Sequence, residues 1–164
     1  MSNHVADIVL KNILGRRSIR SFKPNALPTE SIEIILQAGD AAPSAGGLKS
    51  RKFILITNSD DLDFIIKYIF SHRVREQRQL FRNVPCIIIM CANITSATRK
   101  YKRGRLYAMQ DATFAGQNIM LMAHALGIAS CWIGQVRERK IIERFEISTD
   151  YKLVGLIALG YPSA

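Results

Sequence analysis

The longest helical pattern in this chain of 164 residues is Leu106–Leu126, with the sequence LYAMQDATFAGQNIMLMAHAL. Small and apolar residues lie on nearly every side of this predicted helix: Ala108, Ala112, Ala115, Gly116, Ile119, Met120 and Ala123. A helix that is apolar all round is buried, and alanine and glycine let a neighbouring element approach closely. In so small a protein, another subunit is one candidate for that neighbour. Gly127 then stands where a helix ends in the left-handed conformation.

Apolar runs on both sides of this helix predict a sheet. Cys86–Cys91 is almost entirely apolar, as in a strand that is covered on both faces. Further strands are predicted over residues 52–57, 130–133 and 153–159, and helices over residues 4–14, 29–42, 60–70, 73–82 and 138–145. Residues 97–104 are expected to form an exposed basic loop. Because strands and helices do not alternate regularly, we predict one α+β domain over residues 1–164, with a central sheet flanked by helices.

The composition, with 48% hydrophobic residues, is sufficient for one domain with a substantial core. The apolar runs are too short to cross a bilayer, and the N-terminus lacks the pattern of a signal peptide. The cysteines Cys86, Cys91 and Cys131 form no Cys-x-x-Cys pair, and buried free thiols suit a reducing compartment. We therefore expect a cytoplasmic protein with no membrane partner and no metal site.

The formal net charge of +10 comes almost entirely from one region. Residues 67–105 hold ten basic groups and one acidic group, whereas the rest of the chain holds 13 basic and 12 acidic groups. Such a patch attracts anions: a phosphorylated cofactor, an acidic partner, nucleic acid or a membrane surface. A solvated surface that only aids solubility is the alternative. Few aromatic residues are interleaved with the basic ones, which makes a binding module for nucleic acid or an anionic partner the less favoured interpretation of the chain.

Two short segments suit a phosphorylated, planar ligand. In an extended segment, Arg16, Ser18 and Arg20 project to one face and Arg17 to the other. Guanidinium and hydroxyl groups on one face bind phosphate well. In the stretch Pro43-Ser44-Ala45-Gly46-Gly47, small residues leave the backbone accessible to a flat ring. The alternatives are surface decoration for the first segment and an ordinary loop for the second.

Three further residues are candidates for contact with the same ligand. The side chain of Lys49 can donate to a ring carbonyl, and the amide of Gly134 follows a predicted strand. Trp132 either stacks on a ring or belongs to the core, and His124 is expected in the core or at an interface. The sequence lacks a nucleophile–base arrangement, which favours an enzyme whose cofactor supplies the reactive atom.

Five segments occur in the same order as in one enzyme family: residues 16–22, 42–48, 115–123, 125–134 and 156–162. On these segments the chain resembles the FMN-dependent nitroreductase family, as a short member. The resemblance implies an α+β homodimer with a mixed or antiparallel central sheet. It also implies two FMN molecules bound in clefts between the subunits.

The resemblance assigns roles to individual residues. By similarity, Arg16, Ser18 and Arg20 hold the phosphate and ribityl part of FMN, and Arg17 contributes a backbone contact. The same comparison places further residues around the isoalloxazine ring: Pro43, Ser44, Ala45, Gly47, Lys49, Gln77, Trp132, Ile133 and Gly134. Of these, Gln77 is matched to the pyrimidine side of the ring, and the Gly134 amide to the region near N5.

The activity implied is transfer of hydride from NAD(P)H through FMN to a nitroaromatic, a quinone or a flavin, in a ping-pong sequence. Two departures from the family pattern concern the site. Gly47-Leu48-Lys49-Ser50-Arg51 replaces the usual Asn-x-Gln-Pro-Trp, and the sequence ends at Ala164, where relatives continue with basic residues. Weaker retention of FMN, with greater dependence on Arg16 and Arg20, is the expected consequence. The alternatives are an anion- or nucleic-acid-binding module using residues 67–105, and a flavoprotein without reductase activity.

Overall fold

The computed structural model describes residues 4–69 and 81–163. Gln77, His72 and most of the helix predicted over residues 73–82 lie outside these ranges. The elements are α1 (His4–Gly15), α2 (Thr29–Asp40), η1 (Ala45–Gly47), β1 (Arg51–Ile56), α3 (Ser59–Lys67), β2 (Cys86–Asn93), α5 (Ile94–Lys100), α6 (Gly104–Ala125), β3 (Ala129–Ile133), α7 (Glu138–Arg144) and β4 (Tyr151–Gly160).

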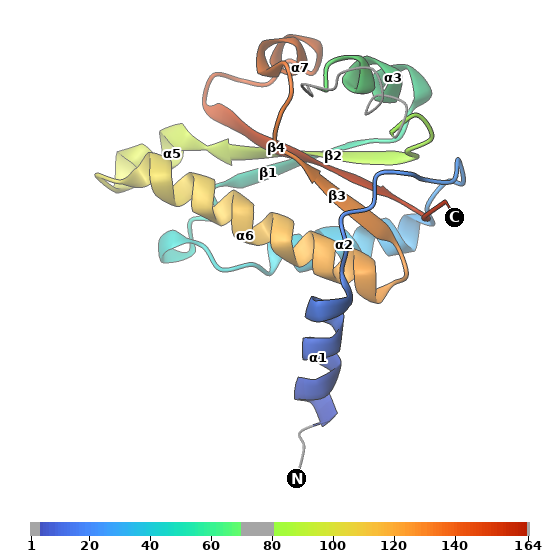
Figure 1. Ribbon diagram of the computed structural model, residues 1–164. Helices are drawn as coiled ribbons and strands as arrows, with labels where there is room; N and C mark the ends of the chain where they lie inside the picture. The colour runs from blue at the N-terminus through green and yellow to red at the C-terminus, as the bar shows by residue number, and fades with distance from the viewer. Residues whose placement is uncertain (1–3, 70–80, 164) are drawn as a thin grey trace.

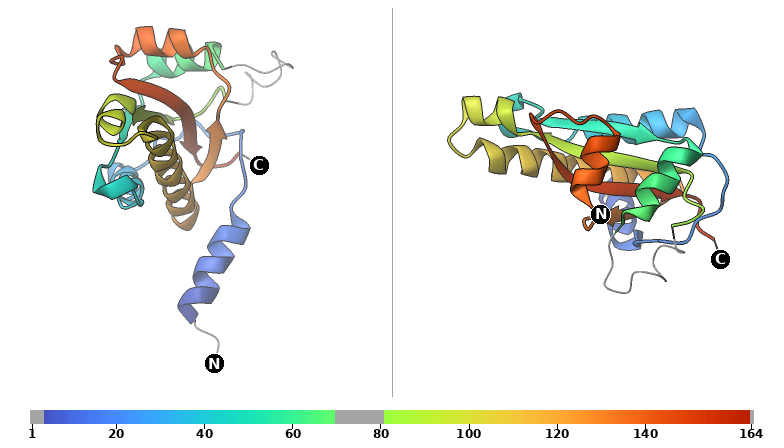
Figure 2. Two further views of the ribbon diagram at one scale, coloured as in Figure 1. Left: turned by 90° about the vertical axis from the view of Figure 1, so that its left-hand side faces the viewer. Right: turned by 90° about the horizontal axis from the view of Figure 1, so that it is seen from above.

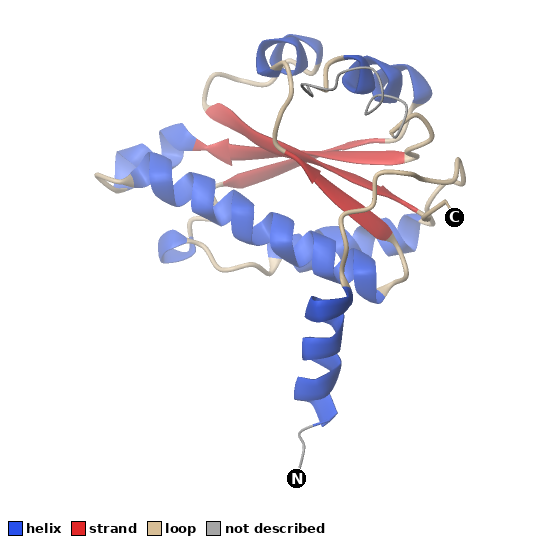
Figure 3. Ribbon diagram, viewed as in Figure 1, coloured by secondary structure: helices blue, strands red, loops and turns tan. Residues whose placement is uncertain are grey.

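The four strands form one sheet in the order β1-β2-β4-β3, and every neighbouring pair is antiparallel. Helices cover both faces of this sheet, with α3 and α7 on one side and α2 and α6 on the other (Figures 1 and 3). The prediction of an α+β fold with a central sheet between helices is therefore confirmed, and the sheet is antiparallel. The predicted strands, and the predicted helices that fall within the described residues, occur within a few residues of their expected bounds.

Strand β2 lies at the centre of two cores, because its side chains alternate between the faces. Ile87 and Ile89 belong to the core under α3 and α7, whereas Ile88 and Met90 belong to the core against α2 and α6. These side chains have no exposed surface. This arrangement explains the unbroken apolar run that predicted a strand covered on both faces.

Helix α6 packs against its own chain along its small-residue face. Gly39 of α2 lies so close to Ile119 that an added Cβ would be 2.8 Å from the Ile119 side chain. Gly116 stands equally close to the ring of Trp132, at 2.5 Å from such an atom. The small-residue face of α6 therefore packs on α2 and the sheet of the same chain, and a subunit contact on its remaining face stays a prediction.

The prediction of a basic loop over residues 97–104 is wrong, because most of this stretch is helical. The side chain of Asn93 accepts a hydrogen bond from the amide of Ser96 at 3.0 Å and so caps the start of α5. Ala97 is buried against α6, where a Cβ on Gly104 would be 2.1 Å from the Ala97 carbonyl oxygen. The basic residues suggested an exposed loop, whereas the apolar contact of Ala97 with α6 stabilises α5 as a helix.

Helix α1 projects from the body of the protein, as Figures 1 and 2 show. It has no buried residue, although its apolar side chains repeat with helical spacing. Six of them are among the exposed large hydrophobic residues: Val5, Ile8, Val9, Leu10, Ile13 and Leu14. The projecting helix thus carries a large exposed apolar surface. Within the described residues, no helix has the length and hydropathy needed to cross a membrane.

Candidate functional site

The arginine-rich segment that follows α1 lies beside β3. The amide of Ile19 donates to the carbonyl oxygen of Ser130 at 3.0 Å, and Ser18 and Ser130 form a parallel bridge. Further on, the amide of Lys23 donates to the carbonyl oxygen of Tyr161 at 2.8 Å. Residues 16–23 are thus held in an extended path along the edge of the sheet, as the alternating pattern requires.

Arg16 and Arg20 lie near one buried thiol of β3, whereas Arg17 bonds to the end of α1 and lines a cavity together with Arg16. Burial raises the pKa of that thiol, Cys131, and the positive charges of Arg20 and Arg16 oppose that rise. Arg16 also donates to the hydroxyl of Ser18 at 3.5 Å. The guanidinium of Arg17 instead donates to the carbonyl oxygen of Leu14 at 2.5 Å, at the end of α1. We call Arg16, Ser18 and Arg20 the arginine half-site.

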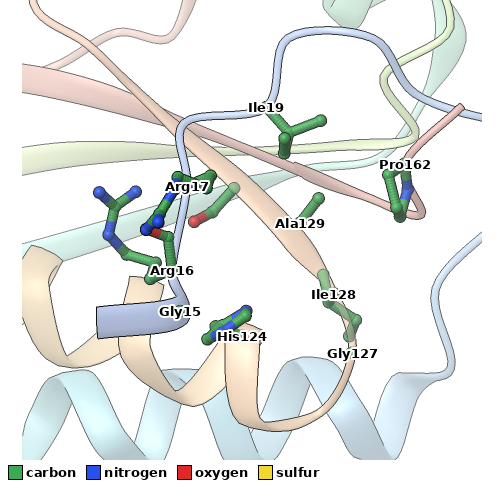
Figure 4. A pocket seen from close by; sticks show the side chains of 10 residues that line it. Gly15, Arg16, Arg17, Ile19, His124, Gly127, Ile128, Ala129 and Pro162 are labelled. Carbon is green, nitrogen blue, oxygen red and sulfur yellow. The ribbon is translucent and has the colours of Figure 1, made fainter. Parts of the chain in front are cut away.

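Arg16 of the arginine half-site lines a cavity of about 320 Å³ together with Arg17, whereas Ser18 and Arg20 are not in its lining (Figure 4). Its lining comes from the end of α1, the end of α6 and the start of β3, and includes Arg16, Ile19, His124 and Ser130. The Ser130 hydroxyl is buried and has no hydrogen-bond partner. Among the described residues, no carboxylate pairs with Arg16 or Arg20. Two guanidinium groups without a counter-charge suit an anion such as phosphate.

The second predicted segment forms a tight loop that is held by one buried carboxylate. Asp111 of α6 accepts from the amide of Ala45 at 3.0 Å and from the amide of Ser50 at 3.3 Å. Inside the loop, the hydroxyl of Ser44 accepts from the amide of Lys49 at 3.0 Å. Asp111 is only 3% exposed, so these hydrogen bonds are shielded from water. We call residues 43–49 the loop half-site.

Arg51 anchors the other side of the same loop. Its guanidinium donates to the carbonyl oxygens of Asp40 and Ala42, the latter at 3.0 Å, and to that of Pro43 at 3.4 Å. The Arg51 side chain is 1% exposed and therefore satisfies the end of α2 from inside the protein. Arg51 stands in the stretch that departs from the family pattern, and its role here is to hold the loop half-site.

Two features of the loop half-site suit the approach of a flat ring. Gly46 and Gly47 have positive φ angles of 55° and 69°, so the turn depends on glycine. A Cβ built on Gly47 meets no atom within 4 Å, which means that this side of the loop is open. The Lys49 ammonium, predicted to reach a ring carbonyl, pairs with the exposed Asp40 carboxylate at 2.5 Å. Such a surface pair is weak and leaves the lysine able to rearrange.

The end of β3 supplies the remaining predicted residues. The half-buried ring of Trp132 packs between Gly116 and Gly155, beside the core. Ile133 is buried on the opposite face, and Gly134 is exposed directly after the strand. Contact between these residues and a cofactor stays a prediction.

The two half-sites are far apart in one chain. Asp111, which holds the loop half-site, and His124, which lines the cavity at the arginine half-site, are 13 positions apart on α6. At 1.5 Å per residue, they are separated by about 20 Å along the helix. One chain therefore presents the predicted phosphate-binding and ring-binding groups at separate places.

The chain matches the model of the Nitroreductase family over residues 13–161. It belongs to the nitroreductase family. A relative from Methanothermobacter thermautotrophicus, provisionally named NADH dehydrogenase/NAD(P)H nitroreductase, is 32% identical over 159 residues, which cover 94% of this chain and 78% of the relative.

Two solved structures show the same fold. A nitroreductase family protein from Clostridium novyi NT has a TM-score of 0.85 and 26% identity, covering 94% of this chain and 85% of the other. An FMN-dependent nitroreductase from Clostridium difficile R20291 has a TM-score of 0.78 and 25% identity, covering 94% and 88%. The fold described above is thus the fold of this family.

Asp111 and Arg51 were missed by the reasoning from sequence. Asp111 is the only acidic residue within the long apolar helix, on the same face as Ala108 and Ala115. A carboxylate on a buried helical face requires hydrogen-bond donors, and this is a signal that the sequence did contain. The role of Arg51 has no such signal, because its partners are main-chain carbonyls.

Proposed function

We propose that this protein is an FMN-dependent oxidoreductase that takes reducing equivalents from NAD(P)H and passes them to a small acceptor by a ping-pong sequence. A nitroaromatic, a quinone or a free flavin is a suitable acceptor. Family membership supports this proposal, as do the names of similar proteins that specify FMN and NAD(P)H. Bound FMN would supply the ring that accepts hydride at N5 and releases it to the acceptor.

The separation of the two half-sites is the observation that most shapes the proposal. A phosphate at the arginine half-site and a ring at the loop half-site of the same chain would have to bridge about 20 Å along α6. A two-fold dimer that sets the arginine half-site of one protomer beside the loop half-site of its partner would remove this difficulty. We therefore propose a homodimer with FMN at each of two shared sites.

Exposed apolar side chains support the same dimer. Alongside α1, the exposed face of α6 carries Leu106 at 42% and Phe114 at 49% exposure. A groove of about 580 Å³ runs between these two helices, with Ile8, Val9 and Leu121 in its lining. A second copy of the chain, seated on this face, would bury an apolar surface that one protomer leaves in water.

Within each shared site, the described residues would perform distinct tasks. Arg16, Ser18 and Arg20 would bind the phosphate and ribityl chain, and the backbone of residues 43–45 would lie against the ring. The Gly134 amide would face the ring edge near N5. Lys49 and Arg20 would stabilise negative charge on the reduced ring. Gln77, outside the described residues, keeps its proposed place beside the pyrimidine ring.

We also propose that the whole chain acts as one domain in the cytoplasm. The thiols of Cys86, Cys91 and Cys131 are free and buried, and a reducing compartment keeps such thiols unpaired. This location also supplies the pyridine nucleotide that the proposed activity requires.

The first test is the visible spectrum of the purified protein after addition of FMN. We expect one FMN per chain, and anaerobic NADPH or NADH should bleach its absorbance. Arg16→Ala and Arg20→Ala should each weaken FMN binding by about 10- to 100-fold, as expected for loss of hydrogen bonds to a charged group. Arg139→Ala on α7 is the control, because that side chain is 90% exposed in the opposite helical layer. A protein that takes up no FMN would refute the proposal.

A mixed dimer tests whether the site is shared. One chain carries Arg16→Ala and Arg20→Ala, and its differently tagged partner carries Asp111→Ala. If each site combines both chains, one site receives both defects and the other receives neither, so the mixed dimer binds one FMN tightly. If each site lies within one chain, both sites are impaired and no tight site remains. The latter result would overturn the shared site while leaving the family and fold unaffected.

A further inference from the structure

The turn that joins α5 to α6 carries a concentration of positive charge that the proposed flavin site does not use. Five exposed basic residues occur within seven positions: Arg99, Lys100, Lys102, Arg103 and Arg105. We call residues 99–105 the basic turn. In the part of the chain that the structure describes, none of the five forms an ion pair. Their charge is therefore available to a ligand.

The start of α6 adds to this positive potential. The first turn of this 22-residue helix contains no acidic residue, and its N-terminus carries a partial positive charge. Asp111 is the next carboxylate along the chain, and its two oxygens already accept from the amides of Ala45 and Ser50. The basic turn thus lacks an internal counter-charge and attracts an anion from solution.

Two tyrosine rings order the cations of the basic turn. Tyr101 and Tyr107 meet edge to face, with their ring centroids 5.6 Å apart. The Lys100 ammonium lies 5.5 Å from the centroid of Tyr101, and the Arg103 guanidinium lies 5.8 Å from that of Tyr107. These contacts restrict both basic side chains before any ligand arrives, which lowers the entropic cost of binding.

The basic turn also touches the loop half-site. A Cβ built on Gly46 would lie 1.9 Å from the hydroxyl oxygen of Tyr101 and 3.6 Å from the ammonium of Lys100. Positive charge therefore stands at the rim of the place proposed for the flavin ring. A substrate that reacts at this ring has its remaining groups within reach of these cations.

We propose that the basic turn binds the phosphomonoester of a nucleotide substrate while that substrate reacts at the flavin. This inference rests on the proposed function. A phosphomonoester carries close to two negative charges at neutral pH, and arginine and lysine together match such a group. Two substrates of the proposed reaction can present it: NADPH through its 2′-phosphate, and a flavin mononucleotide acceptor through its terminal phosphate.

The double variant Lys100→Gln/Arg103→Gln tests the site, with Arg139→Gln/Lys140→Gln as the matched control. The control removes the same charge from α7, in the other helical layer. The side chain of Arg139 is 90% exposed and that of Lys140 is 47% exposed. Calorimetry on the FMN-loaded protein compares 2′,5′-ADP with 5′-AMP, and added 5′-FMN with riboflavin. Kinetics of the loaded enzyme compare NADPH with NADH, and FMN with riboflavin as acceptor.

We expect the double variant to lower the preference for the phosphorylated member of one pair by about tenfold, and the control by less than twofold. A fall in the NADPH/NADH ratio of kcat/KM assigns the site to the 2′-phosphate, and a fall in the FMN/riboflavin ratio assigns it to the acceptor. The inference is overturned if neither ratio changes. It is also overturned if the double variant weakens the binding of both members of each pair by the same factor. Failure of the proposed function differs visibly, because then even the unaltered protein neither binds FMN nor oxidises NADPH or NADH.

Discussion

Replacing Asp111 offers a direct test of how the loop half-site is built. In Asp111→Ala, the amides of Ala45 and Ser50 both lose their acceptor, and Ser50 is 2% exposed. An unpaired buried amide costs about 1–3 kcal/mol, so two cost about 2–6 kcal/mol. Since a domain is stable by roughly 5–15 kcal/mol, this loss is large and easily measured.

Asp111→Asn separates the hydrogen bonds from the packing. Its amide oxygen still accepts from one of the two backbone amides, whereas its NH2 group faces the other as a second donor. The expected cost is therefore about 1–3 kcal/mol, between the wild type and the alanine variant. Asp63→Asn on α3 makes the same chemical change at an exposed position, where we expect less than about 0.5 kcal/mol.

Urea unfolding, followed by circular dichroism and by the fluorescence of Trp132, measures these differences, and FMN titration measures the effect on the site. We expect both stability and FMN affinity to decrease from the wild type to Asp111→Asn to Asp111→Ala, because each variant loses hydrogen bonds that hold the loop half-site. An Asp111→Ala protein within 0.5 kcal/mol of the wild type would show that the two hydrogen bonds do not hold the loop. Unchanged FMN affinity in a clearly destabilised variant would show that the loop does not touch the cofactor.

Three further predictions concern the same loop and the core. Arg51→Met should destabilise the protein by about 2–4 kcal/mol, because it leaves the carbonyl oxygens of Asp40, Ala42 and Pro43 without a buried donor; an unchanged melting temperature would contradict this. Gly46→Ala should destabilise the protein more than Gly47→Ala. Both variants place alanine at a positive φ, which costs about 1–2 kcal/mol, but only the Cβ added at position 46 collides with the Tyr101 hydroxyl. Adding Tyr101→Phe to Gly46→Ala should therefore recover part of the lost stability in thermal unfolding. Burial raises the pKa of Cys86 to about 12 and that of Cys91 to about 11, from an ordinary value of 9.0. As the pH rises, these thiols therefore ionise in the unfolded chain before they ionise in the folded protein. The free energy of unfolding should stay constant below pH 9 and fall above it by roughly 1.4 kcal/mol per pH unit for each thiol, until the thiols of the folded protein ionise too. Urea unfolding at a series of pH values measures this slope, and Cys86→Ala should flatten it; equal slopes in the two proteins would rule the thiol out.

Much of the fold follows from local patterns that sequence reasoning can detect. The apolar run at Cys86–Cys91 predicted a strand with two buried faces, and β2 contributes to both cores. The alternation of Arg16, Ser18 and Arg20 predicted an extended edge segment, which the bridge to Ser130 bears out. In both cases the period of the side chains along the backbone decides the outcome.

Other features depended on partners far away in the chain. The sequence did not predict the α5 helix, because its basic residues suggested a loop. The apolar contact that stabilises it joins Ala97 to α6, a helix that comes later in the sequence. The ring of Trp132 likewise packs between Gly116 and Gly155, which belong to two other elements, α6 and β4.

The sequence by itself determined the helical and strand periods, the places that need glycine, and the chemical types of the candidate site residues. Only the tertiary structure decided that Asp111 and Arg51 hold the loop half-site, and that the basic turn reaches that loop. It alone also set the two half-sites about 20 Å apart along α6. The physical reason is that periodicity and φ angles are local properties of the chain. Hydrogen bonds such as that between Ala45 and Asp111, 66 residues apart, depend on how the whole chain packs.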